Sequence, residues 1–589
     1  MEQGHAPWLD PYSFRPEASP QPNFPGWPFG FAFWPLDAAF GAVIAWNVMQ
    51  LVLYTLAGLV ACAWLRELGL PRSASLAGGL AFAIAPYRVV QSVGHLLGPI
   101  AILLPLSLWA FERALRGSGW WFIGSGIALA SIPLSGQVHF ALGAVPFYLA
   151  YSAVRTRDRC ACVHIHTRPW IIVGAAMSVI AAIGAGILVR QAVIVGSTQA
   201  GGRSLHQVSV YSPRWGDFVT RHLDHGRSEQ FVYLGWVTPL LALAGLVVLF
   251  RARRFGFAAV LALGAVVPAL LALGTRLPLY SALWHAFPPF RFPRVPERLL
   301  PITALCIAAL VAFAVARART HVVAIALVVL ALLFVDLHVR VYGRSVADVH
   351  NIAYARIAHA ATGRLLELPV FDPGVHYGSV YLWYDTKVRR ERPGGYSTTA
   401  PKAAKTISDR LQRLNCGDWS GDTAALLAKL GVRAVALHLG LYVRNAAVPQ
   451  RAYFAWRGLI AHGWSTSATS NEVWLFTHMR VGLQPALREP PRNSPQFCQG
   501  WYGETPAGRF MSETHAPFWI YGSGTLRLRF APSPLPRTFT VDERRQRGPI
   551  LPLGRSGWHV VAVDVPNLEK ADRKKVGLDL LSLSTSPDR

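Results

Sequence analysis

The arginines best suited to chemistry lie in one short stretch, Gly274–Pro301. Arg291, Arg294 and Arg298 stand there among aromatic residues, and repeated prolines predict a loop without regular helix. Guanidinium groups beside aromatic rings at a bilayer edge suit a phosphate headgroup with an apolar tail. The alternative is an interfacial belt whose arginines reach ordinary lipid headgroups.

A second polar stretch, residues 195–232, contains Arg203, Asp217 and Glu229. A carboxylate near arginines at a membrane face can act as a general base toward an acceptor hydroxyl. The alternative is a solvated loop whose charges pair with one another.

Two histidines, His95 and His139, fall at the ends of apolar runs. Polar side chains at membrane depth are costly and are therefore functional candidates. The alternative is a histidine at a helix end that bonds a backbone carbonyl.

The sequence offers no recognised metal or nucleotide motif. Cys160, Cys162, His164 and His166 alternate strictly, whereas structural zinc sites favour pairs separated by two to four residues. Nucleotide-binding loops and metalloprotease or serine-hydrolase motifs are also absent in a suitable context. We therefore assign no metal ligands, although a divalent metal is compatible with the chemistry discussed below.

The composition is that of a membrane protein with soluble parts. Of 589 residues, 52% are hydrophobic and 15% are charged, and the mean hydropathy is +0.31. Soluble proteins average about 25% charged residues. The net charge of +26 comes from short arginine clusters between apolar runs rather than from a nucleic-acid motif, so we predict no nucleic-acid partner.

Successive apolar runs predict a multi-helix transmembrane domain over residues 38–341. Most runs reach the roughly 20 residues that a spanning helix needs, which gives a polytopic α-helical membrane protein with about ten transmembrane helices. The two short runs before residue 155 are either two tilted spans or one re-entrant pair. The runs are 38–65, 73–92, 94–115, 120–133, 138–154, 170–194, 233–250, 255–273, 299–316 and 321–341.

Arginine placement predicts the orientation. One set of connecting loops is short and rich in arginine, and the alternate set is longer and poorer. The positive-inside rule places the first set in the cytoplasm. Residues 1–37, 195–232 and 274–298, with everything after about 342, are then extracytoplasmic.

Two folded regions are predicted after the last apolar run. Residues 345–485 alternate strands with helices and predict a small extracytoplasmic α/β domain. Residues 499–589 contain short strands between Pro- and Gly-rich turns and predict a β-sandwich. Its tryptophans either bind carbohydrate or belong to the core. Cys416 and Cys498 can pair if this region is extracytoplasmic.

Residues 1–37 are rich in Pro, Trp and Phe and lack the features of a signal peptide. We interpret them as an extracytoplasmic aromatic loop on the membrane surface. An N-terminus outside the cell without a preceding span is uncommon. We therefore expect a first transmembrane helix upstream of the given start.

The chain resembles bacterial membrane glycosyltransferases of the GT-C superfamily, and in particular their YfhO-like branch. The resemblance is carried by GHAPWLDPYSF, FAIAPYRVVQSVGHLLGPIAILLPLSLWAFERAL, YLGW, FRFPRVPERLLP and, in the soluble region, LLELPVF, GGYST and LAKLGVRAVALHL. It implies transfer of a sugar from a polyprenyl-phosphate carrier on the outer face of the bacterial cytoplasmic membrane. It also implies an acidic base in the first outer loop, where Asp10 is the only acid in the matching motif, and phosphate binding by Arg294 and Arg298.

These observations lead to one principal hypothesis and two rivals. In the principal hypothesis Arg203, Arg294 and Arg298 bind the carrier phosphate, and Asp10 or Asp217 deprotonates an envelope glycan or lipid acceptor. One rival is a transporter or flippase of lipid-linked sugars, which needs the arginines but no base. The other is a non-catalytic scaffold in envelope assembly.

Overall fold

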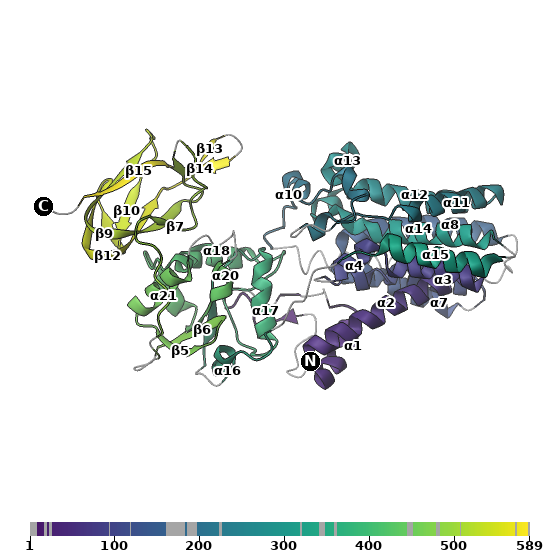
Figure 1. Cartoon of the computed structure of the whole chain (residues 1–589), viewed down its shortest axis with the longest axis horizontal. Helices are drawn as coiled ribbons and strands as arrows, with labels where there is room; N and C mark the ends of the chain where they lie inside the picture. Colours follow the sequence, from purple (N-terminus) through teal and green to yellow (C-terminus); the bar gives the residue numbers. More distant parts are fainter. Residues whose placement is uncertain are drawn as a thin grey trace.

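The computed structural model has two parts that lie end to end along its longest axis (Figure 1). One part is a helical bundle, and the other contains the sheets and the C-terminus. The structure describes residues 9–16, 21–22, 26–92, 95–117, 119–160, 183–184, 197–222, 227–318, 321–340, 348–358, 362–443, 451–478, 483, 485–506, 508–571 and 574–586.

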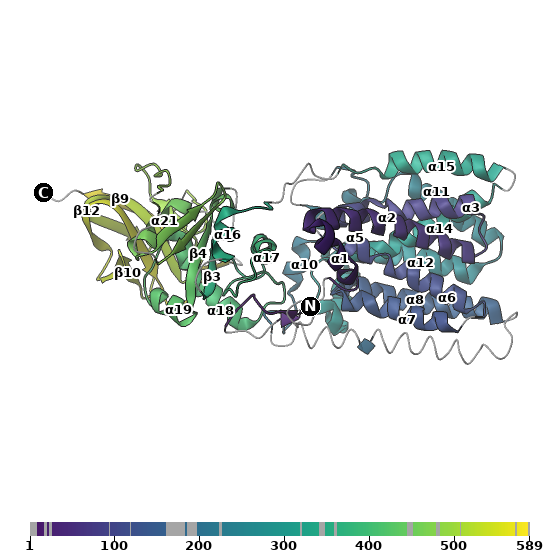
Figure 2. The same cartoon turned by 90° about the horizontal axis from the view of Figure 1, so that it is seen from below.

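The bundle is built from apolar helices around a buried central helix, α14 (Leu300–Ala316). Almost every residue of α14 is buried, and it packs against α3, α11 and α12. Figure 2 shows the same bundle turned by a quarter turn, with α14 inside it. The other bundle helices are α1 (Gly30–Phe40), α2 (Ala42–Glu67), α3 (Arg72–Ala83), α4 (Pro86–Ser92), α5 (Leu97–Ile100), α6 (Leu103–Ala114), α7 (Trp120–Leu134), α8 (Val138–Cys160), α11 (Val237–Arg251), α12 (Phe255–Ala272) and α15 (Val322–Leu337).

Four stretches of described helix are long and apolar enough to cross a membrane: Ala42–Glu67, Leu97–Ala114, Phe255–Ala272 and Pro296–Ala316. The bent pair α3–α4 makes a fifth if it forms one span, and α7, α11 and α15 are shorter apolar helices. The chain is thus a membrane protein by its helices. The expected number of about ten spans stays a prediction, and the run at 170–194 lies largely outside the described residues.

We call the bundle end nearest the sheets the domain-facing end, and the opposite end the far end. At the domain-facing end, Asp336 of α15 accepts hydrogen bonds from the backbone N–H groups of Trp236, Val237 and Thr238, at 2.7, 3.0 and 3.1 Å. The carboxylate therefore satisfies the free N–H groups at the start of α11. Gly235, which lies just before the start of α11, has φ +91°, and a Cβ at this position would lie 2.5 Å from Asp336 Oδ2.

A buried arginine, Arg88, holds the connection between α3 and α5. Its guanidinium donates to the carbonyls of Phe82 and Ala83 and twice to that of Gly98, all within 3.1 Å. Arg88 thereby ties the carbonyls at the end of α3 to the carbonyl of Gly98 in α5.

The loop between α12 and α14 contains a helix that the prolines were expected to prevent. Helix α13 spans Pro278–Ala286, followed by 3-10 turns at Pro288–Arg291 and Pro296–Leu299. Pro278 occupies the first helical position, where a missing N–H costs nothing. The other prolines follow the end of α13, so they limit its length without excluding it.

The N-terminal segment contacts the α/β domain, whereas we had interpreted it as a loop on the membrane surface. The backbone N–H groups of Phe14 and Arg15 donate to the carbonyls of Gly394 and Arg392, at 3.0 and 2.8 Å. Phe14 is buried against Ala400 and Ala404. Residues 12–15 therefore form a turn whose backbone is hydrogen-bonded to residues 392–394.

The α/β domain is a four-stranded sheet with the order β3-β4-β6-β5 and helices around it. Strands β3 and β4 are parallel and the other neighbours antiparallel. Alternate residues of β3 enter two separate cores, Leu366 and Leu368 on one face and Leu365 on the other. Its elements are α16 (Ile352–Ala358), β3 (Arg364–Leu368), α17 (Ser379–Asp385), α18 (Lys402–Leu411), α19 (Thr423–Lys429), β4 (Val432–His438), α20 (Leu439–Val443), α21 (Ala452–Ala461), β5 (Ser465–Thr469) and β6 (Val473–Thr477).

The C-terminal region is rich in sheet, as predicted. Its main strands pair into one seven-stranded antiparallel sheet, and the β-sandwich stays a prediction. The long strands β9 and β12 change register between Leu553 and Gly557, and residues from both of their halves share one core. The strands are β7 (Gln496–Phe497), β8 (Arg509–Phe510), β9 (His515–Phe530), β10 (Thr538–Val541), β11 (Arg544–Gln546), β12 (Ile550–Asp564) and β15 (Asp579–Ser586), beside a β13–β14 hairpin (Glu569–Ala571 and Lys574–Val576).

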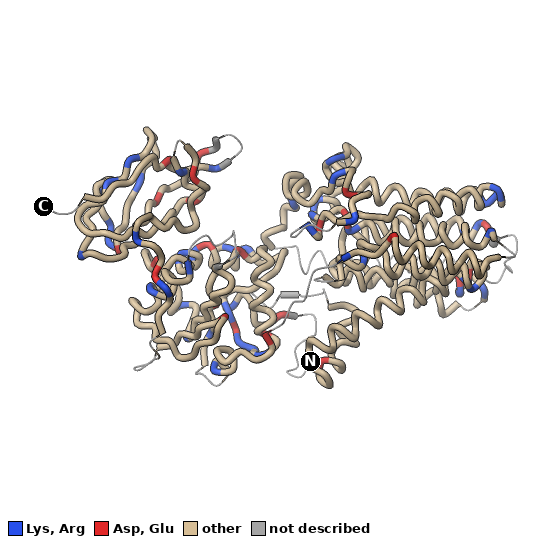
Figure 3. Tube along the Cα trace, in the orientation of Figure 1, with Lys and Arg blue, Asp and Glu red and all other residues tan. Residues whose placement is uncertain are grey.

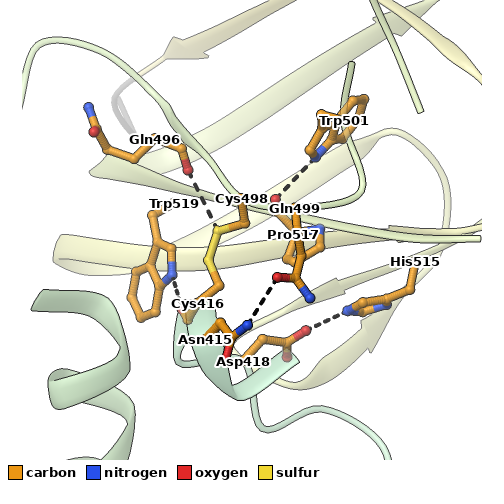
Figure 4. Close-up of a disulfide and its surroundings, with 10 residues drawn as sticks. All are labelled: Asn415, Cys416, Asp418, Gln496, Cys498, Gln499, Trp501, His515, Pro517 and Trp519. Atoms are coloured by element: carbon orange, nitrogen blue, oxygen red, sulfur yellow. Dashed lines mark hydrogen bonds and ion pairs between the residues drawn. A yellow bond between two sulfur atoms is a disulfide. The ribbon is translucent and has the colours of Figure 1, made fainter. Parts of the chain in front are cut away.

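A disulfide joins the α/β domain to this sheet region (Figure 4). The predicted partners Cys416 and Cys498 are bonded, with Cα atoms 6.0 Å apart. Beside them, Trp519 donates to the carbonyl of Cys416 at 2.7 Å. Trp519, Trp501 and Trp558 are buried, so these tryptophans belong to the core rather than to an exposed sugar-binding face.

Candidate functional site

Three connecting segments meet at the domain-facing end of the bundle and bring together an acid, a base and a cation. Glu229 lies in a 3-10 turn at Ser228–Gln230, Arg298 lies just before α14, and His95 lies between α4 and α5. One carboxylate oxygen of Glu229 is 3.0 Å from Arg298 Nη2 and 3.0 Å from His95 Nε2. We call these three residues the charge triad.

The surroundings fix the ionisation of Glu229. Burial works to raise the pKa of its carboxyl, but Arg298 and the hydrogen bond with His95 outweigh burial and lower the pKa to about 2. Gln91 of α4 donates to the carbonyl of Ser228 at 3.0 Å, which ties the turn to the bundle. Glu229 is therefore a fixed anion that orients both neighbours.

Arg294 supplies a second cation at this site. Its guanidinium lies 4.8 Å from the ring centroid of Tyr211, and it forms no ion pair with any carboxylate in the described part of the chain. It acts electrostatically on His376 and Tyr396 of the α/β domain, where burial and then Arg294 lower the pKa of His376. The site therefore includes residues from both parts of the molecule.

The guanidinium of Arg203 is used in hydrogen bonds to backbone carbonyls and is not available to a ligand. Its guanidinium donates to the carbonyls of Phe292 and Thr398, at 2.9 and 3.1 Å, and the residue is only 7% exposed. Burial, helped by Arg294 and Arg298, lowers its pKa to about 10. Because Thr398 belongs to the α/β domain, Arg203 links that domain to the bundle loops.

His139 is also in this region, but it is buried. Its Nε2 atom lies 2.7 Å from the hydroxyl of Tyr280 on α13, and the residue is 1% exposed. Its partner is thus a side-chain hydroxyl and not the backbone carbonyl that the alternative for a helix-end histidine named.

Glu297 is a residue that we did not single out from the sequence. It is fully buried beside Arg298, and both its carboxyl oxygens lack a hydrogen-bond partner among the described residues. The signal was available, because an acid at the start of the apolar run 299–316 is costly and is a functional candidate by default.

The two predicted bases, Asp10 and Asp217, lie outside the charge triad. Asp10 accepts hydrogen bonds from the backbone of Tyr12 and Ser13, at 3.0 and 3.1 Å, on the segment that pairs with the α/β domain. Asp217 caps its own turn by accepting from the backbone of Arg214 at 2.6 Å and pairs with Arg227. Both carboxylates are engaged in local turns.

Charged residues gather at the two ends of the bundle and are sparse between them (Figure 3). Within the described residues, no group of three or more His, Cys, Asp or Glu could hold a metal ion. The alternating Cys and His residues from 162 to 166 lie outside the described residues.

No family model matches the chain, and no curated protein matches it. Among solved structures, it is similar to the oligosaccharyltransferase of Archaeoglobus fulgidus in complex with Zn and sulfate, at 14% identity and a TM-score of 0.41, over 81% of this chain and 67% of that one. It is also similar to the mycobacterial arabinofuranosyltransferase AftD, at 14% identity and a TM-score of 0.45, over 94% of this chain and 55% of that one. A structure of the A. fulgidus oligosaccharyltransferase AglB with an inhibitory peptide and a dolichol-phosphate gives 13% identity and a TM-score of 0.41, over 81% of this chain and 69% of that one. The chain thus spans just over half of the length of AftD, and similarities at this level assign it no activity.

Proposed function

We propose that this chain is a membrane glycosyltransferase that transfers a sugar from a polyprenyl-phosphate carrier to an envelope glycan or lipid acceptor on the outer face of the bacterial cytoplasmic membrane. The observation that carries the proposal is the meeting of Arg294, Arg298, Glu229 and His95 at the end of a membrane bundle, against a water-exposed domain.

The cations have a role in binding the donor. Arg294 lacks a carboxylate partner among the described residues, so its guanidinium can pair with the carrier phosphate. A soluble nucleotide sugar is absent outside the cell, whereas a lipid carrier delivers its sugar within the membrane. The apolar helices next to this end give the lipid tail an environment from which the phosphate can reach Arg294.

The charge triad has a role in proton transfer. A glycosidic C–O bond forms between the acceptor hydroxyl oxygen and the anomeric carbon of the sugar. The bond from that carbon to the phosphate oxygen breaks, and its electron pair goes to the phosphate. His95 takes the hydroxyl proton, because its imidazole is the candidate general base in contact with Glu229. Glu229 holds the imidazole in place, and Arg294 stabilises the phosphate that leaves.

The assignment of His95 as base replaces the first expectation of Asp10 or Asp217. The extracytoplasmic location of this site is supported by the arginine-rich loops at the far end and by the disulfide between Cys416 and Cys498, since disulfides persist in oxidising compartments.

The experiment uses the purified full chain in proteoliposomes with a synthetic polyprenyl-phosphate sugar and a glycan acceptor. We expect His95→Gln to lower transfer about a hundredfold or more while the carrier still binds, and Arg294→Glu to abolish both binding and transfer. Arg276→Gln is the matched control, because Arg276 is an exposed arginine of the same loop.

The same vesicles distinguish a transferase from a flippase of lipid-linked sugars. A flippase moves the lipid-linked sugar between leaflets and needs no base, so His95→Gln leaves its translocation unchanged. Translocation by the wild type without any transfer product would overturn the proposed transferase.

A further inference from the structure

The far end of the bundle contains a cleft that the proposed function does not use. The cleft has a volume of about 450 Å³, and its lining comes from three helix connections and from helix α8: Glu67, Leu68, Gly69, Arg116, Arg155, Asp158, Arg253 and Arg254. Its four arginines face two carboxylates, so its lining carries an excess of positive charge.

The carboxylates at this end are already paired. Glu67 contacts Arg113 at 3.3 Å and Arg116 at 2.9 Å. Asp158 lies 3.7 Å from Arg155. Within the described residues, Arg253 and Arg254 form no ion pair with a carboxylate, so they are the cations available to a ligand.

The floor of the cleft is rigid. Arg155 is 3% exposed and donates to both carboxylate oxygens of Glu112, at 2.6 and 2.9 Å. The guanidinium groups of Arg155 and Arg254 each lie 5.3 Å from the ring centroid of Phe257. Cation–π contact with the same ring therefore holds Arg254 beside the buried pair.

Arg253 takes the left-handed position of the turn that ends α11. It occupies the turn between α11 and α12 with φ +57°, a conformation that glycine adopts freely and that costs other residues about 1–2 kcal/mol. The side chain at this strained position lines the cleft. The N–H groups of Arg253 and Arg254 donate to the carbonyls of Phe250 and Leu249, at 2.9 and 3.0 Å, so this turn ends α11 and directs both side chains toward the cleft.

We propose that this cleft binds the phosphate of an anionic phospholipid headgroup. The site lies where apolar helices end, so a lipid can place its acyl chains along the bundle while its phosphate enters the cleft. Basic clefts between membrane helices bind phosphate-bearing headgroups through such arginines. The phosphate pairs with Arg253 and Arg254, while Arg155 stays paired with Glu112. This lipid site is separate from the charge triad at the opposite end and does not depend on the proposed transferase function.

The test measures the thermal stability and lipid binding of the purified full chain in detergent. The additions are phosphatidylglycerol, phosphatidylcholine and inorganic pyrophosphate, each followed by native mass spectrometry and a melting curve. We expect phosphatidylglycerol to bind and to raise Tm, and phosphatidylcholine to do neither. Stabilisation by pyrophosphate equal to that by phosphatidylglycerol would overturn the lipid assignment in favour of a soluble phosphate.

Two variants make the test independent of folding. Arg253→Gly places glycine where the backbone favours it, so we expect Tm without lipid to stay unchanged or rise, while phosphatidylglycerol affinity falls about fivefold. Arg254→Gln lowers that affinity by a similar factor. Arg317→Gln is the control, since Arg317 is exposed at the same end and does not line the cleft. Wild-type affinity in both Arg253→Gly and Arg254→Gln would overturn the proposal.

Discussion

Arg298 Nη2 and Glu229 Oε1 lie 3.0 Å apart although 69 residues separate them in the chain. The pair joins the last turn before α14 to the turn that precedes α11, and the same oxygen of Glu229 contacts His95. One carboxylate therefore fixes two of the groups that the proposed chemistry needs.

Glu229→Gln is expected to damage both function and stability. The amide leaves Arg298 without its countercharge and no longer fixes the imidazole of His95, so we expect a loss of about 1–3 kcal/mol in the free energy of unfolding and about a hundredfold in transfer. The measurements are a melting curve and turnover with the polyprenyl-phosphate sugar. Glu229→Asp keeps the charge and should lose less of both; equal activity of Glu229→Gln and the wild type would contradict this role.

Asp10→Asn and Asp217→Asn are expected to retain transfer within about threefold of the wild type, because neither carboxylate lies in the charge triad. Turnover under saturating donor and acceptor tests this directly. A loss of a hundredfold in either variant, with an unchanged melting curve, would restore that aspartate as the base in place of His95.

Gly235→Ala is expected to destabilise the domain-facing end. The new Cβ would lie 2.5 Å from the Asp336 carboxylate that caps α11, and φ at this position is +91°. We expect a loss of about 2–4 kcal/mol, seen as a lower Tm. Gly136→Ala is the control, since Gly136 has φ +79° with nothing near its added Cβ. Equal losses in the two variants would show that strain alone, and not the contact with Asp336, causes the effect.

His515 predicts a dependence of stability on pH. Burial works to lower its pKa, but hydrogen bonds with Asp418 and Asp564, both at 2.6 Å, outweigh burial and raise the pKa to about 9. A pKa above the unfolded value of about 6.5 means that the protonated form stabilises the fold. That contribution is full below about pH 6.5 and is lost as pH rises through about 9.

Denaturation at pH 6 and pH 10 measures this effect. The wild type is expected to lose on the order of 3 kcal/mol between the two conditions, and His515→Gln should show a smaller change. The same pH dependence in His515→Gln and the wild type would assign the effect to another group.

The disulfide predicts a second loss of stability in the same region. Cys416 and Cys498 are 82 residues apart in sequence, so the bond restrains a long loop of the unfolded chain. We expect Cys416→Ser with Cys498→Ser to cost about 2–5 kcal/mol and to speed proteolysis of residues 485–495. Cys62→Ala removes a free cysteine of the bundle and serves as the control; unchanged proteolysis in the double variant would contradict the prediction.

Local patterns predicted the helices well, because hydrophobicity along a stretch is a property of that stretch. The apolar runs at 255–273 and 299–316 correspond to α12 and α14. Helix α13, which begins at Pro278, was missed because a proline that ends one helix can also begin the next.

The candidate site was predicted only in part. Arg294, Arg298, Glu229 and His95 were selected by residue type, and the fold brings them together. Arg203 was selected for the same reason, yet backbone carbonyls use its guanidinium. Whether a cation is free or engaged depends on its neighbours, which residue type alone does not show.

The sequence by itself determined that this is a membrane protein with folded regions after its helices. The length of an apolar run and the periodicity of a strand are properties of a short stretch of sequence and do not depend on distant residues. Only the tertiary structure decided that Glu229 joins His95 to Arg298, that Glu297 is buried beside them, and that the turn after Asp10 is bonded to the α/β domain. Those relations depend on packing between segments far apart in sequence, and the charge of each group takes effect only at the distances that this packing sets.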